Sequence, residues 1–355
     1  MIKFDYKVIA IMSGTSLDGI DIIYATYKFN SSWDFEIHHS ETIKYSKDWK
    51  LILSQLVNRS LEELKEIDKS YSEYLSTVIS IFIKANNINV IDFIASHGHT
   101  ALHQPENGLT LQIGNQQILS DLVNHKVVCD FRVQDVKLGG QGAPLVPIGD
   151  RLLFYNYDYC LNLGGFANIS FEEKAKRIAF DICPVNIVLN HYVSKLNLEF
   201  DDKGQLASKG KIHQELLAQL NVLAFYVEKP PKSLGLEWVE INIFPLIGSF
   251  DLKIEDILRT FVEHVAIQIS KIINREGSNL LVTGGGVYNE FLVSRIKNLL
   301  KSEIVIPKKD IVEFKEALIF GLLGVLRQRN EVNCLKSVTG ATKNHSSGKI
   351  LFPNT

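Results

Sequence analysis

The segment SGTSLDGID, from Ser13 to Asp21, combines glycines, hydroxyls and acids in the pattern of a phosphate-binding turn. Glycine lets backbone N–H groups come close to a phosphate, hydroxyls add donors, and an acid can hold Mg²⁺ directly or through water. The residues that fit this chemistry are Gly14, Thr15, Ser16, Asp18 and Gly19. The lysine of a G-x-x-x-x-G-K-[ST] loop is absent, so we expect the turn of a β-hairpin. A plain hairpin turn rich in serine, aspartate and glycine explains the same residues.

Two more glycine clusters follow apolar segments. They are Gly164 and Gly165 in LNLGGFAN (161–168), and Gly284, Gly285 and Gly286 in TGGGVYN (283–289). The paired glycines would let a backbone come near a ligand, although a bulge or tight hairpin explains them better in isolation. The triple cluster follows a buried strand and precedes a helical pattern, which favours a nucleotide cradle at a helix N-terminus. A flexible loop is the alternative for that cluster.

Asp181 follows the apolar run IAF and precedes Ile-Cys-Pro-Val-Asn. An aspartate at a strand end beside a glycine-rich site can act as a general base that accepts a proton from water or a hydroxyl. A helix N-cap is the alternative role, because a proline lies three residues later. The local sequence leaves both roles open.

The segment DFRVQD places Arg132 between Asp130 and Asp135. An arginine with flanking acids can bind a substrate carboxylate or an array of hydroxyls. A surface cluster of ion pairs, of small energetic value, is the alternative.

Three histidines, His97, His99 and His103, have a spacing that resembles a metal site. Alternate residues share a face only in a continuous strand, and we expect Gly98 to interrupt it. No acid or cysteine is adjacent, so polar contacts to a sugar, or simple packing, explain them better than zinc. We take His97 as a candidate substrate-binding residue.

The elements that must position these groups alternate between strands and helices. Apolar, partly alternating residues predict strands at 7–12, 20–27, 90–96 and 159–171 (two strands joined by a turn), and a strand followed by a glycine turn over 280–290. Helical spacing predicts helices at 60–85, 252–274 and 313–327, and Ser60 with Glu63 forms a capping box for the first. This order is typical of a layered α/β fold, and two similar β-turn-β units suggest a pair of related domains. We expect domains at 1–129 and 130–340, with the tail 341–355 packed back on the first.

Composition narrows the function classes. The 355 residues are 46% hydrophobic and 22% charged, with a formal net charge of −2. This balance is globular, and it argues against a nucleic-acid partner and against an anionic membrane. The start lacks the pattern of a signal peptide, and no apolar stretch is long enough to span a bilayer. The four scattered cysteines suggest no disulfide framework, so we expect a cytoplasmic protein.

These segments, in this order, resemble the anhydro-N-acetylmuramic acid kinases from about residue 8 to 342. The blocks that carry the resemblance are MSGTSLDGID, SHGHTALHQP with LQIGN, DFRVQDVKLGGQGAPLVP, LNLGGFANIS, FDICPVN, PPKSLGLE, VTGGGVYN, EALIFG and SVTGA. The resemblance implies two actin/hexokinase-like (ribonuclease H-like) domains around a central cleft, and a homodimer. It also implies a reaction in which ATP phosphorylates O6 of 1,6-anhydro-N-acetylmuramic acid while water opens the anhydro ring. The product would be N-acetylmuramic acid 6-phosphate, in cell-wall recycling.

The resemblance also implies residue roles. ATP and Mg²⁺ would be contacted by Gly14, Thr15, Ser16, Leu17, Asp18, Gly19, Ile20 and Asp21, with Asp18 on the metal, and the nucleotide would lie against Gly164, Gly165, Gly284, Gly285 and Gly286. Asp181 would be the base that activates water. The sugar would be bound by His97, Arg132, Asp135 and Glu316.

The chain departs from the family pattern beside the proposed base. The family has Asp-Thr-Gly-Pro-Gly-Asn there, whereas this chain has Ile182, Cys183 and Val185 in place of threonine and the two glycines. Basic residues after Phe131 are reduced to Arg132, and Ile148-Gly149-Asp150 replaces an aromatic or histidine segment. Two rival functions therefore stay open: a kinase for an ordinary sugar hydroxyl, and a non-catalytic ATP-binding switch. The retained Asp18 and Asp181 count against the switch.

Overall fold

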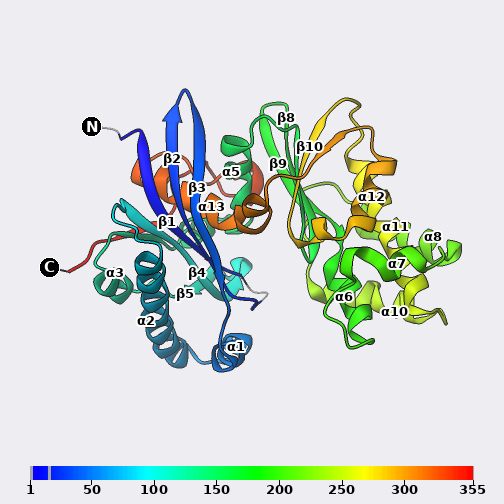
Figure 1. Ribbon diagram of the computed structural model, residues 1–355, viewed down its shortest axis with the longest axis horizontal. Coiled ribbons are helices and arrows are strands. Elements are labelled where there is room, and N and C mark those ends of the chain that lie inside the picture. The colour runs from blue at the N-terminus through cyan, green and yellow to red at the C-terminus, as the bar shows by residue number, and fades with distance from the viewer. Residues whose placement is uncertain (1–2, 15–16, 355) are drawn as a thin grey trace. The chain divides into compact units, whose positions relative to one another are not determined.

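The computed structural model of the chain describes residues 3–14 and 17–354. Its contacts divide it into two compact units (Figure 1). Unit 1 comprises Met1–Leu153 and Phe314–Thr355, and unit 2 comprises Phe154–Glu313. These boundaries differ from the expected ones at 129/130 and 340/341. The reason is that 130–153 and 314–340 pack on the first sheet, where Tyr27 donates a hydrogen bond to the Leu318 carbonyl.

Unit 1 is built on a sheet with the strand order β12-β6-β4-β1-β2-β3. Its strands are β1 (Asp5–Ser13), β2 (Ile20–Asn30), β3 (Ser32–Ile43), β4 (Phe93–Gln104), β5 (Leu109–Ile113), β6 (Val127–Cys129) and β12 (Lys349–Leu351). β1, β2 and β3 form an antiparallel meander, and β4 and β6 continue the sheet in parallel from β1. β5 pairs antiparallel with β4, and β12 with β6.

Helices cover both faces of this sheet. The helical elements of unit 1 are α1 (Lys47–Ser54), η1 (Leu56–Asn58), α2 (Leu61–Ala85), η2 (Pro105–Asn107), α3 (Gln117–Val123), α4 (Val133–Lys137), α5 (Val146–Leu153), α14 (Lys336–Thr339) and most of α13 (Lys309–Gln328). α2 begins at the expected capping box of Ser60 and Glu63, and its buried residues share a core cluster with Ile9 and Ile11. α13 covers the opposite face, where Gly321 lies close against Ala10.

Unit 2 repeats the arrangement with the order β11-β10-β7-β8-β9. Its strands are β7 (Tyr159–Leu163), β8 (Phe166–Glu173), β9 (Lys176–Pro184), β10 (Asn279–Thr283) and β11 (Glu303–Val305). Its helical elements are α6 (Asn186–Ser194), η3 (Asp202–Gly204), α7 (Gln205–Lys209), α8 (Gln214–Asn221), η4 (Ala224–Val227), α9 (Leu236–Asn242), α10 (Phe244–Gly248), α11 (Ile254–Ile272), η5 (Gly285–Tyr288) and α12 (Glu290–Leu299). The apolar residues of the long helix α11 lie in the core of this unit, as their spacing predicts, and its middle, from 257 to 269, is covered on nearly all sides.

Both sheets therefore contain a three-stranded antiparallel meander whose first strand is extended by two parallel strands, and the sheet of unit 1 adds β5 and β12. This is the topology of the ribonuclease H-like domain, and its occurrence twice in one chain confirms the predicted actin/hexokinase-like class. Among the described residues, no helix is both long and apolar enough to cross a membrane.

One expectation about β4 is wrong. The strand does not stop at Gly98 but continues to Gln104, with an irregular register between Ile11 and Ser13 of β1. Gly98 takes the left-handed conformation at φ 73°, and a Cβ there would lie 2.4 Å from the Ile113 carbonyl oxygen. The irregularity places His97 against Phe320 of α13 and His99 against Tyr71 of α2, so the two rings lie on opposite faces of the sheet.

Candidate active site

The turn between β1 and β2 closes as the sequence predicts, because Ser13 pairs with Ile20. Thr15 and Ser16 lie outside the described residues. Gly19 must be glycine, since a Cβ there would lie 2.6 Å from the Ile43 carbonyl oxygen of β3. Asp18 is exposed, whereas Asp21 accepts a hydrogen bond from the Thr42 hydroxyl at 2.6 Å.

Unit 1 has a cavity of 330 Å³ at the end of β1. Its lining residues are Met12, Ser13, Gly14, His97, Thr100, Arg132 and Glu316. They come from β1, β4, α13 and the segment before α4, which the sheet order brings together. The cavity thus joins the predicted phosphate turn to three of the four predicted sugar-binding residues.

Arg132 and His97 form a fixed pair in this cavity. Arg132 Nε donates to His97 Nε2 at 2.9 Å, and its Nη1 donates to the Gly142 carbonyl at 2.7 Å. Because His97 Nε2 accepts, its proton must be on Nδ1, which lies 2.8 Å from the Gly98 carbonyl. Burial and the Arg132 charge hold the His97 pKa well below 6.5, so the ring stays neutral and orients the guanidinium.

Glu316 lies on the same cavity wall, on α13. The surrounding protein removes water and raises the pKa of this carboxyl group, while the charges of Arg132 and Lys315 act in the opposite direction. Lys315 itself pairs with Asp150 of α5 at 3.1 Å, and both side chains are buried. The ion pair fixes the backbone beside Glu316, and no sequence motif indicates it.

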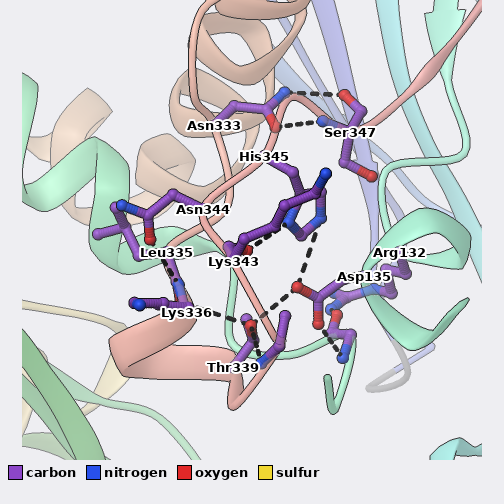
Figure 2. Close-up of polar contacts among 12 residues, drawn as sticks. Arg132, Asp135, Asn333, Leu335, Lys336, Thr339, Lys343, Asn344, His345 and Ser347 are labelled. Atoms are coloured by element: carbon purple, nitrogen blue, oxygen red, sulfur yellow. Dashed lines mark hydrogen bonds and ion pairs between the residues drawn. The ribbon is translucent and has the colours of Figure 1, made fainter. Parts of the chain in front are cut away.

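Asp135, the fourth predicted sugar-binding residue, is fully buried and does not line the cavity. Its Oδ2 accepts a hydrogen bond from the Gly142 N–H, and its Oδ1 accepts one from the Thr339 hydroxyl, both at 2.8 Å (Figure 2). These bonds hold the loop that supplies the carbonyl partner of Arg132. Asp135 is therefore placed to position Arg132, and its direct contact with a sugar stays a prediction.

In unit 2, Asp181 lies in β9 rather than at a helix end, so the N-cap alternative is wrong. α6 begins at Asn186 and has Val185 as its N-cap residue. Burial raises the pKa of Asp181, and the Leu234 N–H, which donates to its Oδ2 at 2.8 Å, partly opposes this. The neighbouring substitutions Ile182 and Cys183 are buried in the core.

The two glycine clusters of unit 2 lie side by side. Gly284 has φ 85°, and a Cβ there would lie 2.5 Å from Asn162 Oδ1, next to the first cluster. Gly285 is exposed, and no atom of the described residues lies within 4 Å of the position that a Cβ would take, so its backbone is accessible. The triple cluster itself enters the short turn η5, which begins at Gly285, and the longer helix α12 begins only after its N-cap residue Asn289.

Sequence reasoning missed several groups that build the site. Ser13 donates to the Gly98 carbonyl at 2.7 Å and so shares an acceptor with His97. Leu234 holds Asp181 through its backbone, which no side-chain motif can reveal. Thr100 lines the cavity only because β4 continues past Gly98.

Comparison with known proteins identifies the family. Residues 6–353 match the family described as anhydro-N-acetylmuramic acid kinase. The chain belongs to this family. A relative of that name from Pseudomonas syringae pv. tomato is 34% identical over 83% of this chain and 84% of its own length. Another from Clostridioides difficile is 33% identical over 96% of this chain and 97% of its own. The predicted resemblance is confirmed, and anhydro-N-acetylmuramic acid kinases are phosphotransferases with an alcohol group as acceptor.

Proposed function

We propose that this chain uses ATP to phosphorylate O6 of 1,6-anhydro-N-acetylmuramic acid while water opens the anhydro ring. The product is N-acetylmuramic acid 6-phosphate, an intermediate of cell-wall recycling. The observation that carries the proposal is Asp181, a partly buried carboxylate with a raised pKa, held by one backbone N–H and not used as a cap. Such a carboxylate is suited to accept a proton from water.

The phosphates of ATP are assigned to the turn from Gly14 to Asp21, whose described part fits this role. Gly19 lies too close to β3 for any side chain, and Asp18 is exposed beside it. An exposed carboxylate with room for water suits Mg²⁺, which binds through few protein ligands and keeps several waters. When bound, Mg²⁺ neutralises charge that develops on the transferred phosphoryl group. The accessible backbone of Gly285, with Gly164, Gly165, Gly284 and Gly286, is assigned to the nucleotide.

The sugar is assigned to the cavity of unit 1. The substrate carries a carboxylate, one acetamido group and one free hydroxyl, and Arg132 offers a charged donor of fixed orientation. His97 keeps that orientation, Glu316 faces the same cavity, and Asp135 acts through the loop at Gly142. In this assignment Asp135 is a positioning residue.

The chemistry follows from these roles. Asp181 takes a proton from water as the water oxygen bonds to C1, and the C1–O6 bond breaks. O6 then attacks the γ-phosphorus, ADP leaves, and the proton on Asp181 returns to solvent. Positioning and charge neutralisation supply most of the acceleration in phosphoryl transfer, which is consistent with a site built from glycines, one arginine and carboxylates.

Oxygen-labelled water tests this reaction against the two rival functions. With anhydro-sugar and saturating MgATP, the label should enter C1 of the product and not the phosphate. An ordinary sugar kinase would phosphorylate a free hydroxyl with no label at C1, and an ATP-hydrolysing switch would place the label in phosphate. Either result would overturn the proposal. We also propose, from the family alone, a cytoplasmic homodimer, which light scattering of the purified protein would test.

A further inference from the structure

A buried cluster in unit 1 contains no residue that lines the cavity, although it lies close to Arg132. Among the described residues, Asp135, Cys334 and His345 place one potential ligand atom each within 4.8 Å of one another. Their exposed fractions are 0%, 1% and 6%. Cys334 and His345 lie outside the motifs of the candidate active site.

Backbone pairing brings the last two residues together. Cys334 and His345 form an isolated antiparallel bridge, in which each N–H donates to the other's carbonyl, at 3.0 and 3.2 Å. Residues directly opposite in such a bridge present their side chains on the same side. The nearby Asn333 amide, which bonds to the Ser347 carbonyl and the Leu323 carbonyl, holds this C-terminal segment against unit 1 (Figure 2).

The imidazole of His345 faces Asp135 with one hydrogen-bond acceptor directed at another. His345 Nδ1 lies 3.2 Å from the Lys343 carbonyl, which can only accept, so Nδ1 must carry a proton. The lone pair of Nε2 in the neutral ring then points toward Asp135 Oδ1, another acceptor, at 3.5 Å. Nε2 is buried and makes no hydrogen bond to any described residue. Two buried acceptors this close require a proton or a cation between them.

The thiol of Cys334 favours a metal cation over a proton. We propose that Asp135, Cys334 and His345 bind a Zn²⁺ ion, with water as the fourth ligand. Thiolate, imidazole and carboxylate together are typical of zinc and not of Mg²⁺ or Ca²⁺. Zinc bond lengths put tetrahedral ligand atoms about 3.5 Å apart, a separation that the His345–Asp135 pair already has.

The surroundings match a zinc centre in charge and orientation. A carboxylate and a thiolate together balance the two positive charges of the ion. Burial and the charge of Asp135 raise the pKa of the Cys334 thiol, while Arg132 and Ser347 act in the opposite direction. Zinc binding would therefore release the thiol proton. The carbonyl at His345 Nδ1 and the two donors on Asp135 are the outer contacts that orient metal ligands.

Such an ion would connect the C-terminal segment to α4. Asp135 lies one helical turn after Arg132 and holds the loop at Gly142 that Arg132 contacts. Zinc would thus stabilise the position of Arg132 in the cavity wall, through Asp135 and the loop at Gly142, without contacting a substrate.

Metal analysis of the purified full chain tests the proposal directly. Protein expressed with added zinc and passed over a desalting column should retain about one zinc per chain, measured by plasma mass spectrometry. Cys334→Ser and His345→Gln should each weaken zinc binding by at least about tenfold. Cys160→Ser is the matched control, because Cys160 is an equally buried cysteine in unit 2, and it should keep the zinc.

Cobalt provides a second measurement that needs no activity assay. Wild-type protein expressed with Co²⁺ should show thiolate-to-metal charge-transfer absorption in the near ultraviolet, and Cys334→Ser should lose it. Zinc-free wild-type protein, or zinc that both variants retain, would overturn the proposal. Because metal content is read independently of turnover, its failure is distinguishable from failure of the proposed kinase reaction.

Discussion

The hairpins that open the two sheets occupy the same place in the topology but are built for different tasks. In unit 1 the turn between β1 and β2 is long and carries hydroxyls and the exposed Asp18. In unit 2 the turn between β7 and β8 is two glycines long, and the Gly165 carbonyl accepts the Val185 N–H while the Gly164 carbonyl accepts the Asn186 N–H. The second hairpin therefore fixes the end of β9 and the start of α6, and with them Asp181.

In the proposed reaction, the two copies of the fold would have different roles. Unit 1 would bind phosphate and sugar, through the turn after β1 and the cavity lined by Arg132 and Glu316. Unit 2 would supply the base, Asp181, and the accessible glycine backbone at Gly285. The fold sets where strand ends lie, and the side chains there set what each unit can do.

The largest expected effect tests whether the base belongs to unit 2. Asp181→Asn removes the proton acceptor but keeps an oxygen for the Leu234 N–H, so folding and ATP binding should persist. Turnover with anhydro-sugar should fall by roughly 10²–10⁴-fold. Asp251→Asn, an exposed site in the same unit, is the control and should leave the rate unchanged. An unimpaired rate in Asp181→Asn would remove this residue from the mechanism.

The buried ion pair of unit 1 should have the next largest effect. Lys315→Met leaves the Asp150 carboxylate buried without its lysine, so the free energy of unfolding should fall by about 3–5 kcal/mol. Lys309→Met, at an exposed position of the same helix, should change it by less than about 0.5 kcal/mol. Urea denaturation of both variants measures the difference. Equal stability would mean that Asp150 is satisfied without Lys315.

A third prediction concerns the phosphate turn itself. Gly14→Val adds a branched side chain where backbone is expected to meet phosphate, and it should weaken ATP binding by roughly ten- to a hundredfold, an overpacking cost of about 1–3 kcal/mol. Gly248→Ala is the control, since nothing lies within 4 Å of an added Cβ there. Calorimetric titration with ATP compares the two. Normal affinity in Gly14→Val would place the phosphates elsewhere.

The sequence predicted those parts of the fold that repeat locally. Strand alternation located both hairpins, and helical spacing located α2, α11 and α13 within a few residues. The expected domain boundaries differ from those of the two units, because a local sequence pattern does not indicate which sheet a helix packs on. In the structure, α4, α5 and most of α13 belong to unit 1. The continuation of β4 was missed because a left-handed glycine can produce either an interruption or a bulge.

The candidate site was predictable in its residue types but not in its contacts. Arg132 and His97 are 35 residues apart, and they meet because β4 and β6 are neighbours. Asp135 and Arg132 belong to the same short motif, so the sequence suggests the same substrate-binding role for both. In the structure, α4 directs the Asp135 side chain into the interior, where it accepts a hydrogen bond from Thr339. Contacts between distant segments depend on the register of the sheet, which a single sequence does not state.

The smallest expected effect compares one buried histidine in each unit. His264 of unit 2 is fully buried, lies within hydrogen-bond distance of Asn221 and Tyr226, and has its pKa lowered from 6.5 to about 3 by burial. The pKa of His97 in unit 1 is also lowered by burial, and repulsion from the Arg132 charge lowers it further. Below pH 6.5 the unfolded chain binds a proton at each position, whereas the folded chain does not. Stability should therefore fall as pH falls through this range.

For His264 the loss should be about 1.4 kcal/mol per pH unit well below pH 6.5, until the folded ring also titrates near pH 3. Urea denaturation of wild type and His264→Gln at about pH 7.5 and about pH 5.5 isolates this contribution, because the carboxylates titrate alike in both proteins. The gap in unfolding free energy between the two proteins should narrow at the lower pH by about 1.3 kcal/mol. A gap that stays constant would mean that His264 binds its proton in the folded state, and that its bonds to Asn221 and Tyr226 hold a charged ring.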